Sequence, residues 1–446
     1  MNIGGLFKLG LWSQARTMAG QTPESRNRYV DFLRALSILA VISGHWLMAA
    51  PHVIDGNLAI ANMLELEPWT RWLTWGFQVM PVFFLVGGYA NGVSWNAATR
   101  DGLGYSEWLA SRLGRLIKPV LPLVLAWVLI GGVGNQIGVR AEILSVASQV
   151  ALVPIWFLSV YIVVALLVPL TWGAWRRYGM ASFWVLALLA IVDDALFFAF
   201  GLRDLGWLNY AFVWLAVHQL GYAWRDGRIT GVRNAVTWAI GGMVLLFAMV
   251  YWGPYPIGMV SVPGEDVSNT LPPKFAMLAL GVTQMGILLA LESPAQRWLS
   301  RLGPWTATLL VNGMIMTIYL WHLTASTLVV GLALVVGNIG LEVDPGTSLW
   351  WSLRPVWLLV YVAALGLLAP AFSRLERGAG STAGNVTSWR LVLGAMVACS
   401  GLALLALDGV VGTEWLGLRI YVLCLPFLGA YIAGVIRIPQ RPPNRA

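Results

Sequence analysis

The sequence predicts an all-α polytopic membrane protein with about twelve transmembrane helices and both termini in the cytoplasm. Of its residues, 58% are hydrophobic and only 11% are charged, whereas a soluble globular chain has about 25% charged residues. Long apolar runs recur from residue 31 to residue 436, and a spanning helix needs about 20 mainly apolar residues. Many of the 25 Trp residues stand at the ends of these runs, as side chains at a membrane–water interface do.

Twelve segments have the length and hydropathy of a spanning helix. They are residues 31–50, 72–95, 116–135, 155–172, 181–200, 207–224, 235–252, 275–291, 308–336, 352–372, 391–411 and 417–436. Residues 1–28 lack the apolar core and cleavage site of a signal peptide and are expected to be a cytoplasmic tail. Within this tail, Leu6, Phe7, Leu9, Leu11 and Trp12 could form a short amphipathic helix at the interface.

The distribution of basic residues indicates which side each loop faces. With a cytoplasmic N-terminus, 22 of the 28 Lys and Arg residues lie inside, and 13 of the 20 acidic residues lie outside. The six outer basic residues are Arg71, Arg140, Arg203, Lys274, Arg354 and Arg419. Because an excess of Lys and Arg marks cytoplasmic loops, both ends of a twelve-helix chain are predicted to be cytoplasmic.

The sequence also makes a prediction for each of two loops expected on the outer side. The longest, residues 253–274, contains several prolines, which argue against a helix. We expect it to be a surface loop or a cover over the mouth of a site. His52 is expected to be a solvated residue of the first outer loop.

The first predicted helix carries three ionisable residues on one stripe. Arg34 and His45 are eleven residues apart, which places them within about 20° of each other around a helix, and Asp31 lies about 40° to the other side of His45. Along the axis His45 is about 16 Å deeper than Arg34. Ionisable groups at such depth are costly, so His45 is a candidate functional residue. Asp31 and Arg34 could equally be a snorkelling, structural pair.

Five segments, in order along the chain, resemble those of the membrane acyltransferase family 3. They are "RYVDFLRALSILAVISGHW" (28–46), "MPVFFLVGGY" (80–89), "SRLGRLIKP" (111–119), "WFLSVYI" (156–162) and "IYLWH" (318–322). In one of them Gly87 stands where the family often has Ser. The resemblance covers residues 29–375, a ten-helix core, followed by two further helices in residues 390–436 and a cytoplasmic tail, residues 437–446.

The resemblance implies transfer of an acyl group, preferably acetyl, from cytoplasmic acyl-coenzyme A to a hydroxyl of an envelope sugar, glycolipid or polysaccharide. An acceptor of particular interest is a trehalose mycolate glycolipid, which would make envelope-export machinery a partner. The expected location is the inner or plasma membrane, with no nucleic acid partner. No Cys/His cluster has metal-ligand spacing, and no metal is expected.

Such a transfer needs a base for the acceptor hydroxyl, and neutral imidazole suits this role near neutral pH. His45 is the predicted base. Asp193 and Asp194, in the fifth helix, and His322, in the ninth, are expected at a similar depth, about 18–21 Å from the cytoplasmic ends of their helices. The aspartates could instead be solvated at a helix end, and His322 could serve packing beside Tyr319.

The donor's phosphates would be held by basic side chains through charge-assisted hydrogen bonds. The candidates are Arg34 and three residues of the expected inside loop 96–118: Arg112, Arg115 and Lys118. Tyr319 and Trp156, in matched segments, are candidate substrate-binding residues. His218 is expected to be structural.

Two other classes of protein remain open at this point. A secondary transporter or exporter of a lipid or glycoconjugate could use Asp, Arg and His as an intramembrane relay, although the two halves show no repeat. A binding or sensory membrane protein would not need a base at this depth.

Overall fold

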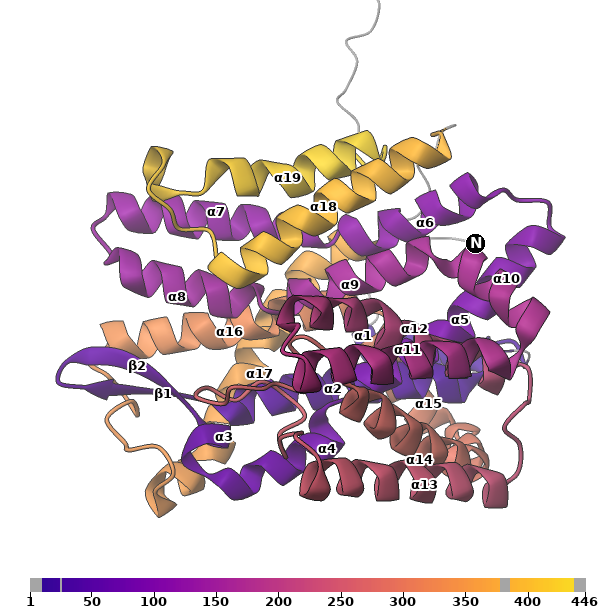
Figure 1. The fold of residues 1–446 in the computed structure, drawn as a ribbon. Coiled ribbons are helices and arrows are strands. Elements are labelled where there is room, and N and C mark those ends of the chain that lie inside the picture. Colours follow the sequence, from indigo (N-terminus) through magenta and orange to yellow (C-terminus); the bar gives the residue numbers. More distant parts are fainter. Residues whose placement is uncertain (1–9, 25, 378–385, 437–446) are drawn as a thin grey trace, which may run out of the picture. The chain divides into compact units, whose positions relative to one another are not determined.

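The chain is described by a computed structural model over residues 10–24, 26–377 and 386–436. These residues are almost entirely helical, and their only sheet is one pair of short antiparallel strands (Figure 1). The predicted fold class is therefore confirmed. Among the expected segments, the tail 437–446 and residues 1–9 lie outside the described part of the chain.

Within the described part of the chain, ten helical segments are long and apolar enough to cross a membrane. They are Arg28–Met48, Pro68–Arg100, Tyr105–Gln136, Ala141–Leu166, Met180–Ala199, Val232–Trp252, Phe275–Leu299, Ile315–Val335, Ser348–Ser373 and Ser388–Asp408. Each overlaps one predicted span. The other two predicted spans correspond to the shorter helices α12 (Asn209–Arg225) and α19 (Ile420–Ile432). The number of twelve spans and the sides of the termini stay predictions.

The described residues form two compact units, and each unit is described by itself. The first takes in residues within 1–94, 168–315 and 330–360; the second takes in residues within 95–167, 316–329 and 361–446. Three long helices, α5 (Met80–Arg100), α16 (Ile315–Val335) and α17 (Ser348–Arg377), contribute residues to both.

The first unit is built on α2 (Arg28–Met48) and on the helices of residues 168–315. These are α10 (Val168–Tyr178), α11 (Met180–Ala199), the 3-10 helix η3 (Arg203–Leu208), α12, α13 (Val232–Trp252), α14 (Phe275–Leu299) and α15 (Leu302–Asn312). Helices α13 and α14 run side by side, as do α11 and α12 (Figure 1).

A short helix precedes the first span. Helix α1 (Leu11–Gly20) packs on α15, where Ala19 is buried against Trp305 and Leu309. The indole nitrogen of Trp305 donates to Thr22 Oγ1 at 2.9 Å. Trp12 is exposed. The helix expected in the N-terminal tail is therefore present over part of the predicted residues, with Leu6, Phe7 and Leu9 outside the described chain.

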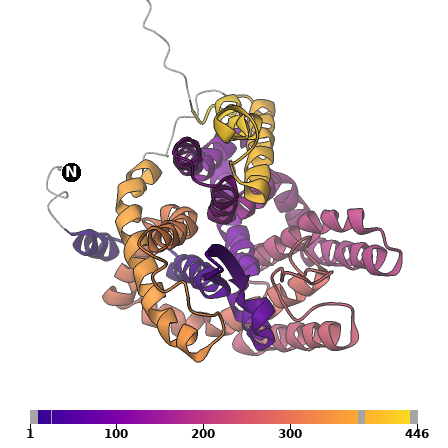
Figure 2. The same cartoon turned by 90° about the vertical axis from the view of Figure 1, so that its left-hand side faces the viewer.

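The connection that follows the first span holds structure that the sequence analysis missed. Strands β1 (Ala49–Ile54) and β2 (Asn57–Asn62) form a hairpin, visible in Figure 2. Its two-residue turn is Asp55–Gly56, both with positive φ, the conformation that Asp-Gly favours in tight hairpins. His52, expected to be solvated, is buried in β1 with Nδ1 3.1 Å from Ala50 O. The hairpin is followed by α3 (Met63–Leu66), η2 (Pro68–Leu73) and α4 (Thr74–Phe77).

The second unit packs the C-terminal helices onto the middle of the chain. Its members include α6 (Tyr105–Ile117), α7 (Val120–Gln136), α8 (Ala141–Leu152), α9 (Pro154–Leu166), α18 (Ser388–Asp408), η4 (Trp415–Gly417) and α19. Helix α18 contacts α6, α8, α9 and α19, and Cys399 Sγ lies 3.5 Å from Ser159 O. The two helices beyond the expected core are thus an integral part of this unit.

Helix α6 corrects the expectation of an inside loop over residues 96–118. It begins after Gly104, whose N–H donates to the Glu107 side chain at 2.9 Å. A carboxylate three residues into a helix satisfies an N–H that has no partner within the helix. The basic residues expected on a loop therefore lie on a helix.

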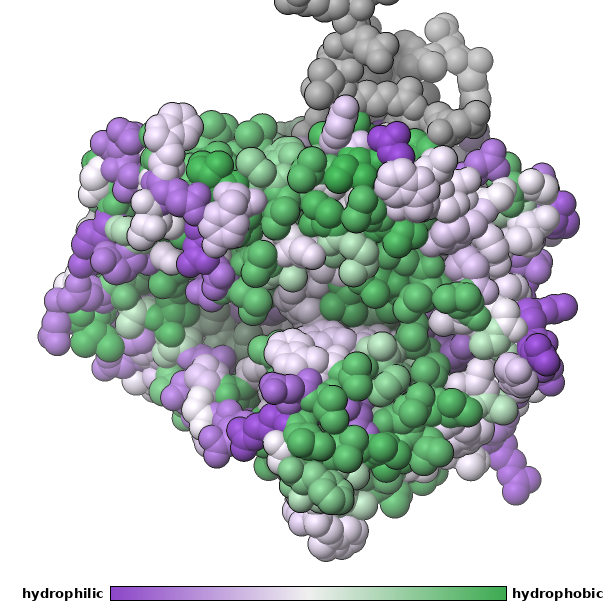
Figure 3. Space-filling model, turned by 45° about the horizontal axis from the view of Figure 1, so that its top comes forward, coloured by the Kyte–Doolittle hydropathy of each residue, from purple (hydrophilic) through white to green (hydrophobic). Residues whose placement is uncertain are grey.

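The helices expose apolar side chains along their length, as a lipid-facing surface requires. Figure 3 shows apolar residues spread across the visible surface and polar residues collected towards its edges. The large apolar side chains that are exposed on these helices include Leu129, Leu188, Val244, Leu359 and Leu367. A water-soluble protein would not expose so many large apolar side chains.

Candidate active site

Helix α2 carries Asp31, Arg34 and His45 on one continuous element, as predicted. It begins after Asn27, whose side chain accepts hydrogen bonds from Tyr29 N and Val30 N at 3.0 and 3.3 Å. An Asn at this position stabilises a helix start by satisfying otherwise unpaired N–H groups. Its last turn contains His45, and Ala49 N donates back to His45 O.

The two charges near the start of α2 pair with each other and with a third residue. Asp31 Oδ2 accepts from Arg26 Nε at 2.6 Å, and Arg34 Nη1 lies 3.9 Å from Asp31 Oδ1. The Arg34 side chain is 39% exposed, so it can still donate to an anion. Asp31 is thus bonded to Arg26 and lies close to Arg34 at one end of the helix, while His45, which is partly buried, lies near the other end.

The predicted aspartates lie near the end of α11, and Asp194 is fully engaged by neighbouring segments. Its Oδ1 accepts from Asn209 Nδ2 at 2.9 Å, and its Oδ2 accepts from Tyr255 Oη at 2.9 Å and Phe275 N at 2.7 Å. These donors come from α12, from the loop 253–274 and from the start of α14. None of them is His45, so the pairing of an aspartate with His45 stays a prediction.

Asp193 shares a buried charge cluster with Lys274. The Asp193 side chain is buried and has no hydrogen-bond partner among the described residues. Lys274 is fully buried, with Nζ 3.8 Å from the centroid of the Phe197 ring. Burial lowers the pKa of Lys274, and the charges of Asp194 and Asp193 act in the opposite direction. Lys274 was counted only as an outer basic residue in the sequence analysis.

Tyr255 is a second residue that the sequence analysis missed. Burial and the charge of Asp194 raise the pKa of Tyr255, so the phenol remains a donor to that carboxylate. Through this bond the cluster holds the loop 253–274 against the end of α11.

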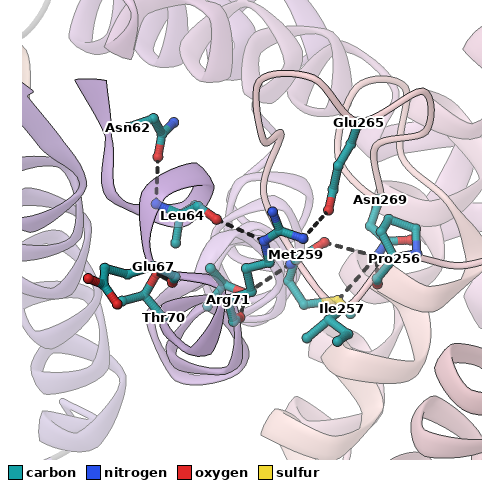
Figure 4. A network of polar contacts seen from close by, with 12 residues as sticks. Asn62, Leu64, Glu67, Thr70, Arg71, Pro256, Ile257, Met259, Glu265 and Asn269 are labelled. Carbon is teal, nitrogen blue, oxygen red and sulfur yellow. Dashed lines mark hydrogen bonds and ion pairs between the residues drawn. The ribbon is translucent and has the colours of Figure 1, made fainter. Parts of the chain in front are cut away.

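The loop 253–274 contains no helix, as predicted, and is also bonded to the segment before α5. Figure 4 shows part of this network. Arg71 bridges Leu64 O and the Glu265 carboxylate, both at 2.8 Å. Met259 is held twice, because its N–H donates to Thr74 Oγ1 at 2.8 Å and its carbonyl accepts from Gln78 Nε2 at 2.9 Å. Two separate sets of polar contacts therefore fix this loop.

The segment "MPVFFLVGGY" forms the start of α5, which crosses α12 at very short range. A Cβ on Gly88 would lie 2.0 Å from His218 O, and one on Gly221 would lie 2.2 Å from Leu85 O. Only glycine permits two backbones to approach this closely. Beside the crossing, the His218 ring is fully buried and its Nε2 lies 3.1 Å from Asn91 Nδ2, in agreement with a structural role.

The second unit contains the remaining candidates. His322 is fully buried on α16, with Nδ1 2.6 Å from Tyr319 O, and Tyr319 Oη donates to Pro154 O at 2.7 Å. A neutral imidazole that donates from Nδ1 carries its lone pair on Nε2. Trp156 lies in the first turn of α9. The tyrosine therefore ties α16 to the start of α9 close to Trp156.

Arg112, Arg115 and Lys118 follow one another at intervals of three residues along α6 and its C-terminal end. Such a spacing places them along one side of a helix. Arg115 is exposed and donates to Ser111 Oγ at 2.9 Å, and the Arg112 guanidinium lies 5.3 Å from the centroid of the Trp108 ring. The arrangement presents a basic stripe.

The candidate residues are divided between the two units. Arg34, His45, Asp193 and Asp194 belong to the first, and Arg112, Arg115, Lys118, Trp156, Tyr319 and His322 belong to the second. Among the described residues, no group of three or more His, Cys, Asp or Glu side chains could hold a metal ion.

The fold and these residues define a multi-pass membrane protein with ionisable groups on its spanning helices. The family model of an acyltransferase domain matches residues 27–372. The chain therefore belongs to the acyltransferase family 3, and it is a membrane acyltransferase. No curated protein and no solved structure matches the chain.

Proposed function

We propose that this protein transfers an acyl group, preferably acetyl, from cytoplasmic acyl-coenzyme A to a hydroxyl of an envelope sugar, glycolipid or polysaccharide. The observation that carries the proposal is the stripe of α2, with Arg34 at one end and His45 at the other, in a chain that belongs to an acyltransferase family. A cytoplasmic donor places the protein in the inner or plasma membrane.

The chemistry assigned to His45 is general base catalysis. The acceptor oxygen attacks the thioester carbonyl carbon while the imidazole takes the hydroxyl proton. The carbon–sulfur bond then breaks, and the imidazolium returns the proton to the coenzyme A thiolate, so that the products are an ester and free coenzyme A. Positioned general bases contribute about 100- to 10,000-fold to such rates.

His322 is the second imidazole that this chemistry can use. Its bond to Tyr319 O orients the ring in the way that a third group orients a catalytic His. We assign it to hydrogen bonding of the acceptor hydroxyl, and Tyr319 and Trp156 to the same substrate region. Asp193 and Asp194 are kept as candidates for orienting His45.

Coenzyme A phosphates are assigned to Arg34, Arg112, Arg115 and Lys118. Arg34 and Arg115 retain exposed guanidinium groups, and guanidinium groups bind phosphate through paired, charge-assisted hydrogen bonds. A trehalose mycolate glycolipid is the preferred acceptor where the host makes one, and envelope-export machinery is then the expected partner.

Purified protein incubated with acetyl-coenzyme A and an envelope extract tests the proposal. Free coenzyme A should appear together with an acetylated sugar or glycolipid detected by mass spectrometry. A deletion strain should lack the same acetylated species. A transporter or exporter would release no coenzyme A, and that result would overturn the assignment.

A further inference from the structure

Arg354 is a buried guanidinium at the end of the helix that carries His45. It lies seven residues into α17 and is only 4% exposed. The sequence analysis counted it among the outer basic residues, for which a solvated position would be the ordinary expectation. A buried Arg within an apolar span needs a stabilising environment that repays its desolvation.

The contacts of Arg354 are with the backbone at the end of α2. Its Nη2 donates to Trp46 O at 2.8 Å and also to Ala49 O. The guanidinium carbon lies 4.2 Å from the centroid of the Trp350 ring, and Trp350 is itself buried against Ala50. One nitrogen thus joins α17 to two carbonyl groups of a segment about 300 residues earlier in the chain.

These two carbonyl groups belong to residues close to the hydrogen bond between Ala49 N and His45 O, which closes the last turn of α2. Trp46 follows His45 directly, and Ala49 donates its own N–H to His45 O. The last carbonyls of a helix have no partner within it and carry its partial negative charge. Arg354 supplies both a donor and a positive charge there, so that the backbone that directly follows His45 is held in place.

We propose that Arg354 is a positioning residue for His45. It does not touch the reacting atoms; it fixes the terminal turn of α2, and with it the direction of the imidazole. The proposal rests on the proposed function of His45. Displacement of a catalytic group by about 1 Å can cost on the order of 100-fold in rate, so loss of this anchor should lower kcat. Donor binding, which is assigned in part to Arg34 near the opposite end of α2, should be unaffected.

Two variants separate the donor function of Arg354 from its packing. Arg354→Met removes the N–H groups but keeps a long side chain against Trp350. Arg354→Lys keeps a charged nitrogen with enough N–H groups for both carbonyls. Arg203→Met, which removes an exposed outer Arg, is the control. Transfer is measured with radiolabelled acetyl-coenzyme A in membranes that contain each variant, and folding is checked by size-exclusion chromatography in detergent.

Arg354→Met should lose about 10- to 100-fold in kcat with a donor KM within about twofold of the parent. Arg354→Lys should recover most of this loss, and Arg203→Met should match the parent. In a His45→Ala background, Arg354→Met should cause no further loss, because residues that act through one another are not additive.

Each contrary result contradicts either the positioning role of Arg354 or the role of His45 as the base. If Arg354→Met alone keeps parental activity while His45→Ala alone inactivates the protein, the positioning role is overturned and the role of His45 as the base is left intact. Full activity of His45→Ala would overturn the proposed function. An equal, additive loss in both backgrounds would also overturn the positioning role. Failure of both Arg354 variants to fold would do so as well, because Arg354 would then be needed for stability alone.

Discussion

Two substitutions at Asp194 distinguish a structural clamp, which its contacts favour, from the candidate role of orienting His45. Its three hydrogen bonds join α11 to α12, to the loop 253–274 and to α14. Asp194→Ala removes all three hydrogen bonds and leaves the part-buried N–H of Phe275 without its acceptor. It also leaves Lys274 without one of its two negative neighbours. Removing one partner of a buried charged group costs about 3–5 kcal/mol, so a large fall in stability is expected.

Asp194→Asn should be much milder, because its neighbours can adapt. The amide oxygen can still accept from Tyr255 and Phe275. On the other side, Asn209 can turn its own amide to accept from the new NH2 group, since Asn209 Oδ1 has no hydrogen-bond partner among the described residues. The loss is then mainly charge assistance, about 1 kcal/mol for each retained bond.

Thermal unfolding in detergent measures both effects. The thiol of Cys399 is buried, so its reaction with a maleimide dye reports unfolding, with Cys424 replaced by Ser. Asp266→Asn, on an exposed position of the same loop, is the control. Activity should stay within about tenfold of the parent in Asp194→Asn. If that variant is stable but loses about 10,000-fold in kcat, as expected when an Asp that orients a catalytic His is neutralised, the clamp is refuted and an Asp–His pair is favoured instead.

Four further predictions concern the base, the donor site, the helix crossing and the topology. His45→Ala should lose about 100- to 10,000-fold in rate. His45→Gln should do little better, because an amide cannot take a proton. A folded and fully active His45→Gln protein would exclude His45 as the general base. Arg34→Ala should weaken coenzyme A binding about 10- to 100-fold, and Arg34→Lys should recover only part of it, as measured by calorimetry; unchanged binding in Arg34→Ala contradicts the assignment. Gly88→Ala should destabilise the fold because its Cβ would meet His218 O at 2.0 Å, whereas Gly241→Ala, which meets no atom within 4 Å, should not lower the unfolding temperature. In a chain without its two Cys residues, a Cys at exposed Leu103 should react with an impermeant thiol reagent only from the cytoplasm and one at Asp266 only from outside; the opposite pattern would reverse the topology and with it the donor side.

The sequence by itself determined the helical class, the approximate positions of the helices and the stripe on α2. Hydrocarbon offers no hydrogen bonds to the backbone, so apolar runs of spanning length must become helices whatever surrounds them. The position of Arg34 and His45 on one face of a single helix follows from the helix period alone. These features depend only on local spacing, and the order of residues along the chain is therefore enough to specify them.

Local signals also exist for two features that the sequence analysis missed. The Asp-Gly pair at residues 55 and 56 is a hairpin signal within a loop that was expected to be irregular. Gly104 followed by Glu107 is compatible with the start of α6. Hydropathy does not reveal either feature, because it does not distinguish a structured connection between spans from an irregular one.

Only the tertiary structure decided the partners of the buried charges. The basic residues predicted to lie outside include several with specific neighbours: Arg71 binds Glu265, Lys274 lies in the field of Asp193 and Asp194, Arg354 binds carbonyls of α2, and Arg419 binds Asp408. Most of these pairings join segments that are far apart in the sequence. A charge removed from water must be matched by whatever group the fold brings beside it, and no spacing along the chain specifies that group.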